Sequence, residues 1–192
     1  QDSPADVMRG EETQIAGHIL REPGFDGVIC LPGTHTKWAQ ISAGEVVSFR
    51  TFMTGEMFAL LSEASVLKHS LGGCAGGGWD DAGFLSAIGD AMSRPQTIAA
   101  QLFALRAEAL LHDLAPATAR ARLSGALIGI ELAGARPYWL GQNVALVGDK
   151  ALSRLYADAL SAQGLTPTLS DGEQMTLAGL TAAFDTISEI AT

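Results

Sequence analysis

A short polar run combines the groups that proteins use to hold an anion: Gly33, Thr34, His35, Thr36 and Lys37. A glycine lets a ligand approach the backbone, hydroxyl groups donate hydrogen bonds, and a lysine supplies positive charge. An apolar run over 28–31 comes before it and ends at a Pro-Gly pair, which is typical of a buried strand followed by a turn. We predict a phosphate-binding turn, and an ordinary polar hairpin turn is the alternative.

A second polar cluster, Arg9-Gly10-Glu11-Glu12, stands directly before apolar residues with helical spacing, which predicts a helix over about 11–22. Carboxylates in the first turn of a helix interact favourably with the helix dipole, so this pair would stabilise the helix start in any case. The alternative is that these residues form part of a catalytic or binding site. Gly10 would allow a tight turn, Glu11 would direct its carboxylate into a cleft, and Arg9 would hold an anion.

A third candidate site lies where the apolar run 143–147 meets Gly148 and Asp149, directly before a predicted helix. A strand that ends in glycine and leads into a helix start exposes backbone N–H groups of both elements. Nucleotide phosphates bind at such places in many α/β proteins. The sequence therefore predicts a nucleotide contact at Gly148 and Asp149.

Composition restricts the class of protein. With 192 residues, 47% of them hydrophobic, the chain can form one domain or two small ones with a substantial core. A net charge of −9 and the lack of any basic cluster argue against nucleic acid as a partner. No apolar run approaches the roughly 20 residues of a membrane span, and no signal peptide is visible, so we expect no membrane partner.

The two cysteines, Cys30 and Cys74, favour a reducing compartment over a disulfide framework, which suits a cytoplasmic protein. The four histidines show no metal-ligand spacing. The chain opens at Gln1 in a polar segment with no strand before it. That opening is typical of a sequence that begins partway through a longer protein. A processed start and a missing amino-terminal part would both produce it.

The remaining pattern predicts an α/β fold. Three strands joined by short turns form an antiparallel meander, expected at 26–31, 36–42 and 46–53. A helix then begins with Thr54 as its capping residue, and the glycine-rich stretch 71–78 is interpreted as a flexible connector rather than a phosphate loop. Helices follow at 81–93, from Pro95 to about 111, and at 117–135.

In the last of these helices, Gly125 and Gly129 are spaced to permit close approach of a neighbouring element. Arg106 and Glu131 are interpreted as a structural ion pair or a solvated face rather than a site. The carboxy-terminal part alternates between strand and helix, with strands expected at 143–148 and 165–169 and helices at 152–163 and 172–190.

The element order, βββαβαβα with a helical insertion of about 80–136 after the third strand, resembles one half of the actin-like (ribonuclease H-like) ATPase fold of actin, hexokinase and heat-shock-70 proteins. More narrowly, four motifs resemble the carboxy-terminal portion of the 2-oxo-3-deoxygalactonate kinase family over nearly the whole chain. They are Met8-Arg-Gly-Glu-Glu-Thr-Gln14, Pro32-Gly-Thr-His-Thr-Lys-Trp38, Arg50-Thr-Phe-Met-Thr-Gly-Glu56 and Leu123-Ser-Gly-Ala-Leu-Ile-Gly129.

The resemblance implies transfer of the γ-phosphoryl group of ATP, with Mg²⁺, to the 6-hydroxyl of 2-dehydro-3-deoxygalactonate. Glu11 occupies the place of the catalytic base in related sugar kinases, with Glu12 as the second choice, and Arg9 would meet the substrate. Gly33 and Thr34 match the phosphate-binding hairpin of that superfamily, adjoined by His35, Thr36 and Lys37. Its adenosine element carries paired glycines, of which this chain keeps Gly148, followed by Asp149.

The amino-terminal half of that superfamily has no counterpart here, so residues 1–192 are expected to be a carboxy-terminal nucleotide-binding domain that lacks its amino-terminal partner. The expected partners are ATP and a small sugar acid, and a homodimer through the helical block is conceivable. Two alternatives stay open: a non-catalytic actin-like nucleotide-binding module, and a phosphohydrolase of the same fold.

Overall fold

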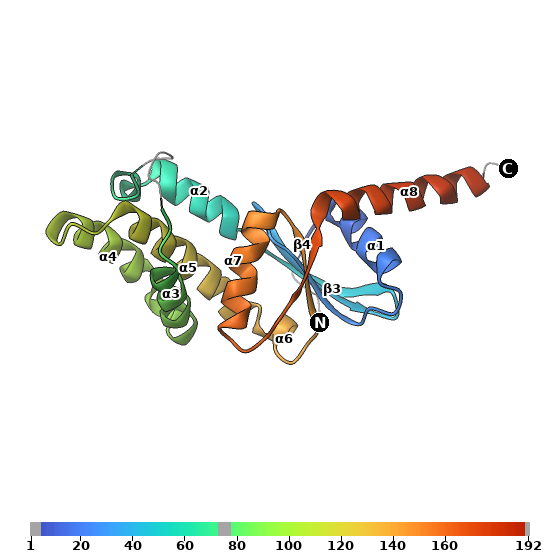
Figure 1. The fold of residues 1–192 in the computed structure, drawn as a ribbon, viewed down its shortest axis with the longest axis horizontal. Helices are drawn as coiled ribbons and strands as arrows, with labels where there is room; N and C mark the ends of the chain where they lie inside the picture. Colours follow the sequence, from blue (N-terminus) through green and yellow to red (C-terminus); the bar gives the residue numbers. More distant parts are fainter. Residues whose placement is uncertain (1–4, 73–77, 191–192) are drawn as a thin grey trace. The chain divides into compact units, whose positions relative to one another are not determined.

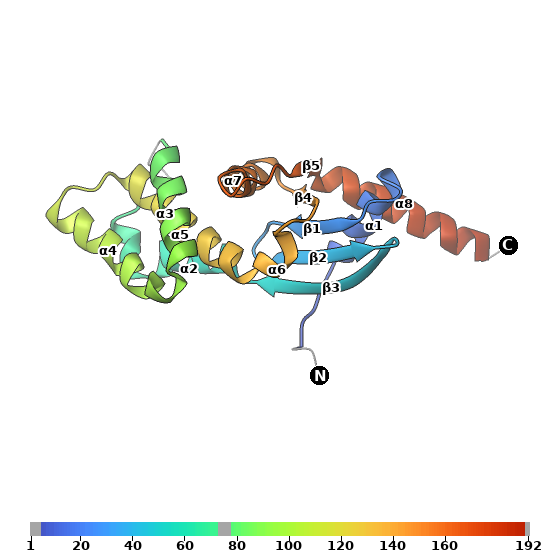
Figure 2. The same cartoon turned by 90° about the horizontal axis from the view of Figure 1, so that it is seen from below.

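The structure is a computed structural model that describes residues 5–72 and 78–190. The chain divides into two compact units (Figures 1 and 2), which we call the sheet unit and the helical unit. The sheet unit comprises Gln1–Phe52 and Pro137–Thr192, and the helical unit comprises Met53–Arg136. The predicted connector at 71–78 lies mostly outside the described residues.

The sheet unit contains a five-stranded mixed sheet in the order β3-β2-β1-β4-β5, with its first three strands side by side in Figure 2. Strands β1, β2 and β3 form the predicted antiparallel meander, and β4 and β5 run parallel to β1. The prediction of an α/β fold is confirmed, and the structure shows that the sheet is mixed. The strands are β1 (Gly27–Leu31), β2 (Thr36–Ser42), β3 (Glu45–Phe52), β4 (Val144–Gly148) and β5 (Thr168–Asp171).

The helices of the sheet unit are α1 (Glu11–Arg21), α7 (Lys150–Ser161) and α8 (Gly172–Ile190), and the short α6 (Arg136–Trp139) follows the helical unit. Two predicted boundaries are wrong. The last strand was expected at 165–169, but it pairs with β4 at Thr168–Asp171. Helix α7 begins at Lys150 rather than at residue 152, because Asp149 accepts hydrogen bonds from its first free N–H groups.

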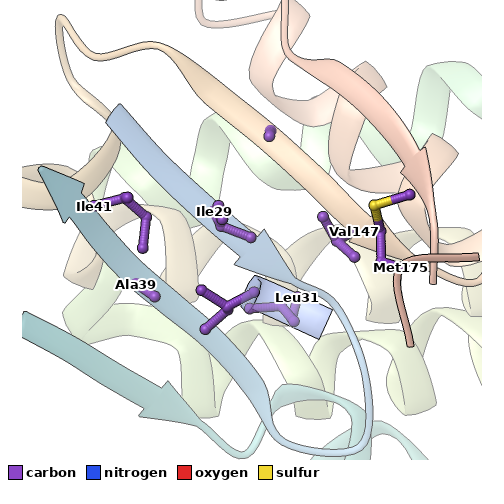
Figure 3. Close-up of a cluster of buried hydrophobic side chains, with 8 residues drawn as sticks. Ile29, Leu31, Ala39, Ile41, Val147 and Met175 are labelled. Carbon is purple, nitrogen blue, oxygen red and sulfur yellow. The ribbon is translucent and has the colours of Figure 1, made fainter. Parts of the chain in front are cut away.

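The core on one face of the sheet follows the two-residue period of the strands (Figure 3). Alternate residues of the central strands are buried there, and Ile15 of α1 and Met175 of α8 pack against them. These strand residues are Ile29, Leu31, Ala39, Ile41, Ala145 and Val147. Helices α1 and α8 therefore cover this face of the sheet.

The helical unit contains α2 (Thr54–Ala64), η1 (Val66–His69), α3 (Asp81–Ser93), η2 (Pro95–Thr97), α4 (Ile98–Leu111) and α5 (Pro116–Gly134). It thus includes α2, ahead of the predicted insertion at about 80–136. The expected close approach at the two glycines of α5 is confirmed, because a Cβ on Gly129 would lie 2.8 Å from that of Ala91 in α3, and one on Gly125 would overlap the carbonyl of Phe84. No helix in the described ranges is long and apolar enough to cross a membrane.

Two predictions about polar residues of the helical unit are corrected. Thr54 does not cap α2 with its side chain, since Met53 holds the N-cap position. The Thr54 hydroxyl instead donates a hydrogen bond to Glu131, a carboxylate that is 1% exposed. Glu131 is therefore a buried, hydrogen-bonded group rather than part of a solvated face, and Arg106 donates to Ser70 Oγ at 3.4 Å.

Candidate functional site

The candidate site lies at the edge of the sheet where the parallel strands β1, β4 and β5 end. The backbones that follow these ends are close together: a Cβ on Gly148 would lie 3.3 Å from the carbonyl oxygen of Pro32. A Cβ on Gly172, at the start of α8, would lie 3.0 Å from Gly148 Cα. The structure thus brings the predicted phosphate-binding turn and the predicted nucleotide contact at Gly148 to one edge.

Strand alternation separates the two last residues of the predicted turn. Thr36 and Lys37 are the first residues of β2, and successive side chains of a strand point to opposite faces. The hydroxyl of Thr36 lies 3.0 Å from that of Tyr156 in α7, and both residues are buried. Lys37 faces the opposite side, where α1 packs. Thr36 therefore joins β2 to α7, a contact that no signal in the sequence predicted.

Lys37 forms an ion pair with Glu11, with 3.1 Å between Nζ and Oε1. Its side chain is 5% exposed and that of Glu11 is 25% exposed. The other oxygen of Glu11, Oε2, accepts a hydrogen bond from the backbone N–H of Arg9 at 2.8 Å. The two predicted site segments, far apart in the sequence, therefore touch through this pair.

Several groups act on the carboxyl of Glu11. Burial raises its pKa, but hydrogen bonds from the backbone N–H groups of Arg9 and Glu11 and from the Lys37 ammonium outweigh that effect. The pKa of Glu11 is consequently below its ordinary value, and the group is ionised at neutral pH. A carboxylate held in this way can accept a proton from a bound hydroxyl.

Glu12 has different surroundings from Glu11. It is exposed, and its Oε2 accepts a hydrogen bond from the backbone N–H of Gly10 at 2.8 Å. It also lines a pocket of about 700 Å³ between the segment before α1 and strand β3. Gly10 has a φ of +113°, a left-handed conformation that favours glycine, so the tight turn expected there is present.

The polar turn itself is accessible. Thr34 and His35 are exposed and Gly33 is half-buried. A Cβ built on Gly33 would have no atom within 4 Å, so there is open space above this part of the backbone. Asp149, by contrast, is engaged in the fold: its Oδ1 accepts hydrogen bonds from Ala151 N at 2.9 Å and Leu152 N at 3.0 Å.

Gln14, the last residue of the Met8–Gln14 motif, has a structural role that the sequence analysis missed. Its Nε2 lies 3.4 Å from the carbonyl oxygen of Gly172 and 3.2 Å from Thr176 Oγ1, and it donates to both. Gln14 thereby ties α1 to the first turn of α8. Its position in a motif that resembles a kinase family is the one signal that pointed to it.

A separate pocket of about 600 Å³ opens at the opposite edge of the sheet, beside the starts of β1, β4 and β5. Its lining includes Phe25, Asp26, Asn143 and Gln163, none of which the sequence analysis singled out. Among the residues that the structure describes, no group of three or more His, Cys, Asp or Glu side chains is arranged to hold a metal ion.

These observations define an α/β protein that presents an ionised carboxylate, a buried lysine and an open polar turn at the carboxyl edge of a mixed sheet. Residues 1–183 match the sequence model of the family described as 2-keto-3-deoxy-galactonokinase. The chain belongs to this family.

Two curated relatives have similar sequences. The Probable 2-dehydro-3-deoxygalactonokinase DgoK1 of Rhizobium meliloti (strain 1021) is 40% identical over 179 residues, which cover 93% of this chain and 58% of that protein. The 2-dehydro-3-deoxygalactonokinase of Escherichia coli (strain K12) is 35% identical over 182 residues, which cover 93% of this chain and 60% of that protein.

A solved structure supports the fold. It is a crystal structure of a Sinorhizobium meliloti protein provisionally assigned as a 2-dehydro-3-deoxygalactonokinase, with a TM-score of 0.87 and 40% identity. The match covers 95% of this chain and 59% of that one. The chain therefore spans about 60% of the length of the relatives that it matches.

Proposed function

We propose that this chain is the nucleotide-binding part of an ATP-dependent kinase that phosphorylates 2-dehydro-3-deoxygalactonate at its 6-hydroxyl group. The observation that carries the proposal is the ion pair between Glu11 and Lys37, because it joins the acidic helix start to the polar turn at one edge of the sheet. Membership of the 2-keto-3-deoxy-galactonokinase family supports this choice of substrate and reaction class.

The strand order supports an actin-like arrangement. An antiparallel β1–β2–β3 meander extended by parallel β4 and β5, with a helical unit after β3, is the topology expected of one half of the actin, hexokinase and heat-shock-70 ATPase fold. In that fold, the turn between the first two strands meets the phosphates of ATP. The open space above Gly33 and the exposure of Thr34 and His35 fit such a role.

Glu11 is the proposed catalytic base. Phosphoryl transfer requires the acceptor hydroxyl to be in line with the γ-phosphate, a carboxylate to take its proton, and donors around the phosphates. The ionised state of Glu11 and the 25% exposure of its side chain suit a carboxylate that takes the proton of the acceptor hydroxyl. Glu12, which turns toward the pocket beside β3, is the second choice, and Arg9 is proposed to meet the carboxylate of the sugar acid.

The phosphate contacts are proposed at the accessible part of the turn, from Gly33 to His35, and at the end of β4. Gly148 would present its backbone to the nucleotide, and Asp149 would act through the start of α7, which it caps. Mg²⁺, when bound with ATP, would neutralise phosphate charge. Magnesium commonly keeps several water ligands and takes one or two protein carboxylates beside the phosphates.

The test is an ATP-consumption assay on a longer chain that includes the part of the family that these residues do not match. We expect ATP consumption that depends on added 2-dehydro-3-deoxygalactonate. Consumption without any sugar acid would indicate a phosphohydrolase. Nucleotide binding without consumption under either condition would indicate a non-catalytic nucleotide-binding module.

A further inference from the structure

Lys37 is a buried lysine, which is an uncommon state for this residue type. Its side chain is 5% exposed, although Thr34 and His35, a few residues earlier in the same turn, are exposed. A buried ammonium group is costly unless it is paired with a charge or hydrogen-bonded. The burial of Lys37 therefore requires partners within the protein.

Both partners identified for the Lys37 ammonium belong to the protein itself. The first is Oε1 of Glu11 at 3.1 Å, and the second is the backbone carbonyl oxygen of His35, which accepts a hydrogen bond at 3.4 Å. Strand alternation directs the side chain toward α1, away from α7, on the face that carries Ala39 and Ile41. The ammonium is thus held between the start of α1 and its own turn.

We propose that Lys37 is a positioning residue that holds the Glu11 carboxylate ionised and in a fixed orientation, rather than a direct ligand of a phosphate group. The proposal rests on the proposed role of Glu11 as the catalytic base. Lys37 contacts Oε1 and the backbone N–H of Arg9 contacts Oε2, so the carboxylate has little rotational freedom. A fixed geometry of the acceptor oxygen favours proton transfer from a bound hydroxyl.

The pairing also has a chemical consequence. A cation in contact with a carboxylate stabilises its charged form, so Glu11 is ionised over a wide pH range but is a weaker base. Other charged or titratable groups on elements that reach this edge of the sheet include Asp6, Arg9, Glu12, His35, Asp149, Lys150, Asp171 and Glu173. Lys37 also lowers the pKa of Asp6, so a titration must be able to distinguish Asp6 from Glu11.

The first test is an NMR titration of the side-chain carboxyl of Glu11 in the 192-residue chain without ligand. Lys37→Met is expected to raise the pKa of Glu11, while Lys150→Met is expected to leave it unchanged. Lys150→Met is a matched control because it removes the same charge as Lys37→Met. Lys150 is exposed and lies at the same edge of the sheet. An unchanged pKa of Glu11 in folded Lys37→Met would overturn the proposal.

The second test does not depend on folding of the Lys37 variant. The ammonium of Lys37 is expected to exchange its protons slowly enough to give a ¹⁵Nζ signal, because it is buried and hydrogen-bonded. Glu11→Gln should shift or remove that signal, and Glu12→Gln should not. A Lys37 signal that is the same in Glu11→Gln and in the wild type would contradict the pairing.

The third test separates positioning from phosphate binding in a longer chain with kinase activity. A positioning role predicts that Lys37→Met lowers kcat by at least about tenfold while the KM for ATP changes by less than about twofold. A large rise in the KM for ATP with unchanged kcat would show a phosphate ligand instead. The two NMR tests use no substrate, so they can succeed or fail independently of the proposed kinase reaction.

Discussion

At the scale of residues, two carboxylates that are adjacent in the sequence have separate environments. Glu11 contacts a buried lysine and a backbone N–H group, whereas Glu12 is exposed and turns toward the pocket beside β3. From the sequence, Glu11 ranked above Glu12 as the catalytic base on the resemblance to sugar kinases. Their contacts now provide a physical reason to prefer Glu11, and a matched pair of variants tests that preference.

We expect Glu11→Gln to reduce kcat by about 10²–10⁴-fold in a longer, active chain, because a catalytic base typically contributes that factor. Glu12→Gln is expected to change kcat far less, since the Glu12 carboxylate is exposed and accepts its hydrogen bond from the backbone N–H of Gly10. Steady-state kinetics of the two variants measure this difference, and circular dichroism checks that both are folded. Full activity in Glu11→Gln would remove this residue from the role.

A second residue-scale prediction concerns His18, which is 1% exposed and lies on α1. Burial lowers the pKa of His18, and the Glu22 carboxylate, 4.0 Å from Nε2, offsets this only in part. The unfolded chain therefore binds a proton at this histidine more readily than the folded protein does. The resulting contribution to stability is complete above the ordinary pKa of 6.5 and is lost as the pH falls below it.

Urea unfolding between pH 5 and pH 8 measures this effect. The free energy of unfolding of the wild type should decrease as the pH falls through this range, and His18→Gln should weaken that dependence. His69→Gln is the control, because His69 is exposed. An equal pH dependence in the wild type and in His18→Gln would show that His18 is not the group responsible.

At the scale of elements, the contact between α1 and α8 depends on residues without side chains. A Cβ on Gly17 would overlap the carbonyl of Met175, and one on Gly179 would overlap the carbonyl of Thr13. The two helices thus approach each other through glycines on both sides. This close approach accompanies the hydrogen bonds from Gln14 to α8, so the start of α1 and its carboxylates are positioned by helix packing.

We expect Gly179→Ala to destabilise the protein, because overpacking typically costs about 1–3 kcal/mol and exceeds the gain in helix propensity. Gly89→Ala in α3 is the control, since a Cβ there would meet no atom within 4 Å. It should stabilise the protein by about 0.4–1 kcal/mol. Chemical denaturation compares the two, and equal effects of both substitutions would contradict the packing of α1 on α8.

At the scale of the whole molecule, the chain matches about 60% of the length of its relatives. The described residues include a proposed base and a proposed phosphate turn. The resemblance to the actin-like fold predicts most sugar contacts in the other half of that fold. We expect the 192-residue chain alone to bind ATP weakly and not to turn over the sugar acid. Calorimetry measures ATP binding and the ATP-consumption assay measures turnover, and appreciable kinase activity of the isolated chain would overturn this expectation.

Much of the fold was predictable because it depends on local pattern. The two-residue alternation of the meander and the helical spacing after Gly10 placed β1, β2 and α1 to within about one residue. The errors occurred where a tertiary contact prevailed over the local sequence pattern. Thr54 is a good capping residue by type, but its hydroxyl donates a hydrogen bond to Glu131. The bounds of β5 follow from its pairing with β4.

The sequence by itself determined which polar residues follow which strands and helices, because turn residues and hydrophobic periodicity are local properties of the sequence. Only the tertiary structure decided which of them meet. Lys37 contacts Glu11 while its neighbour Thr36 contacts Tyr156, because a strand sends successive side chains to opposite faces and different helices cover those faces. The burial that makes Lys37 a partner of Glu11 arises from this packing.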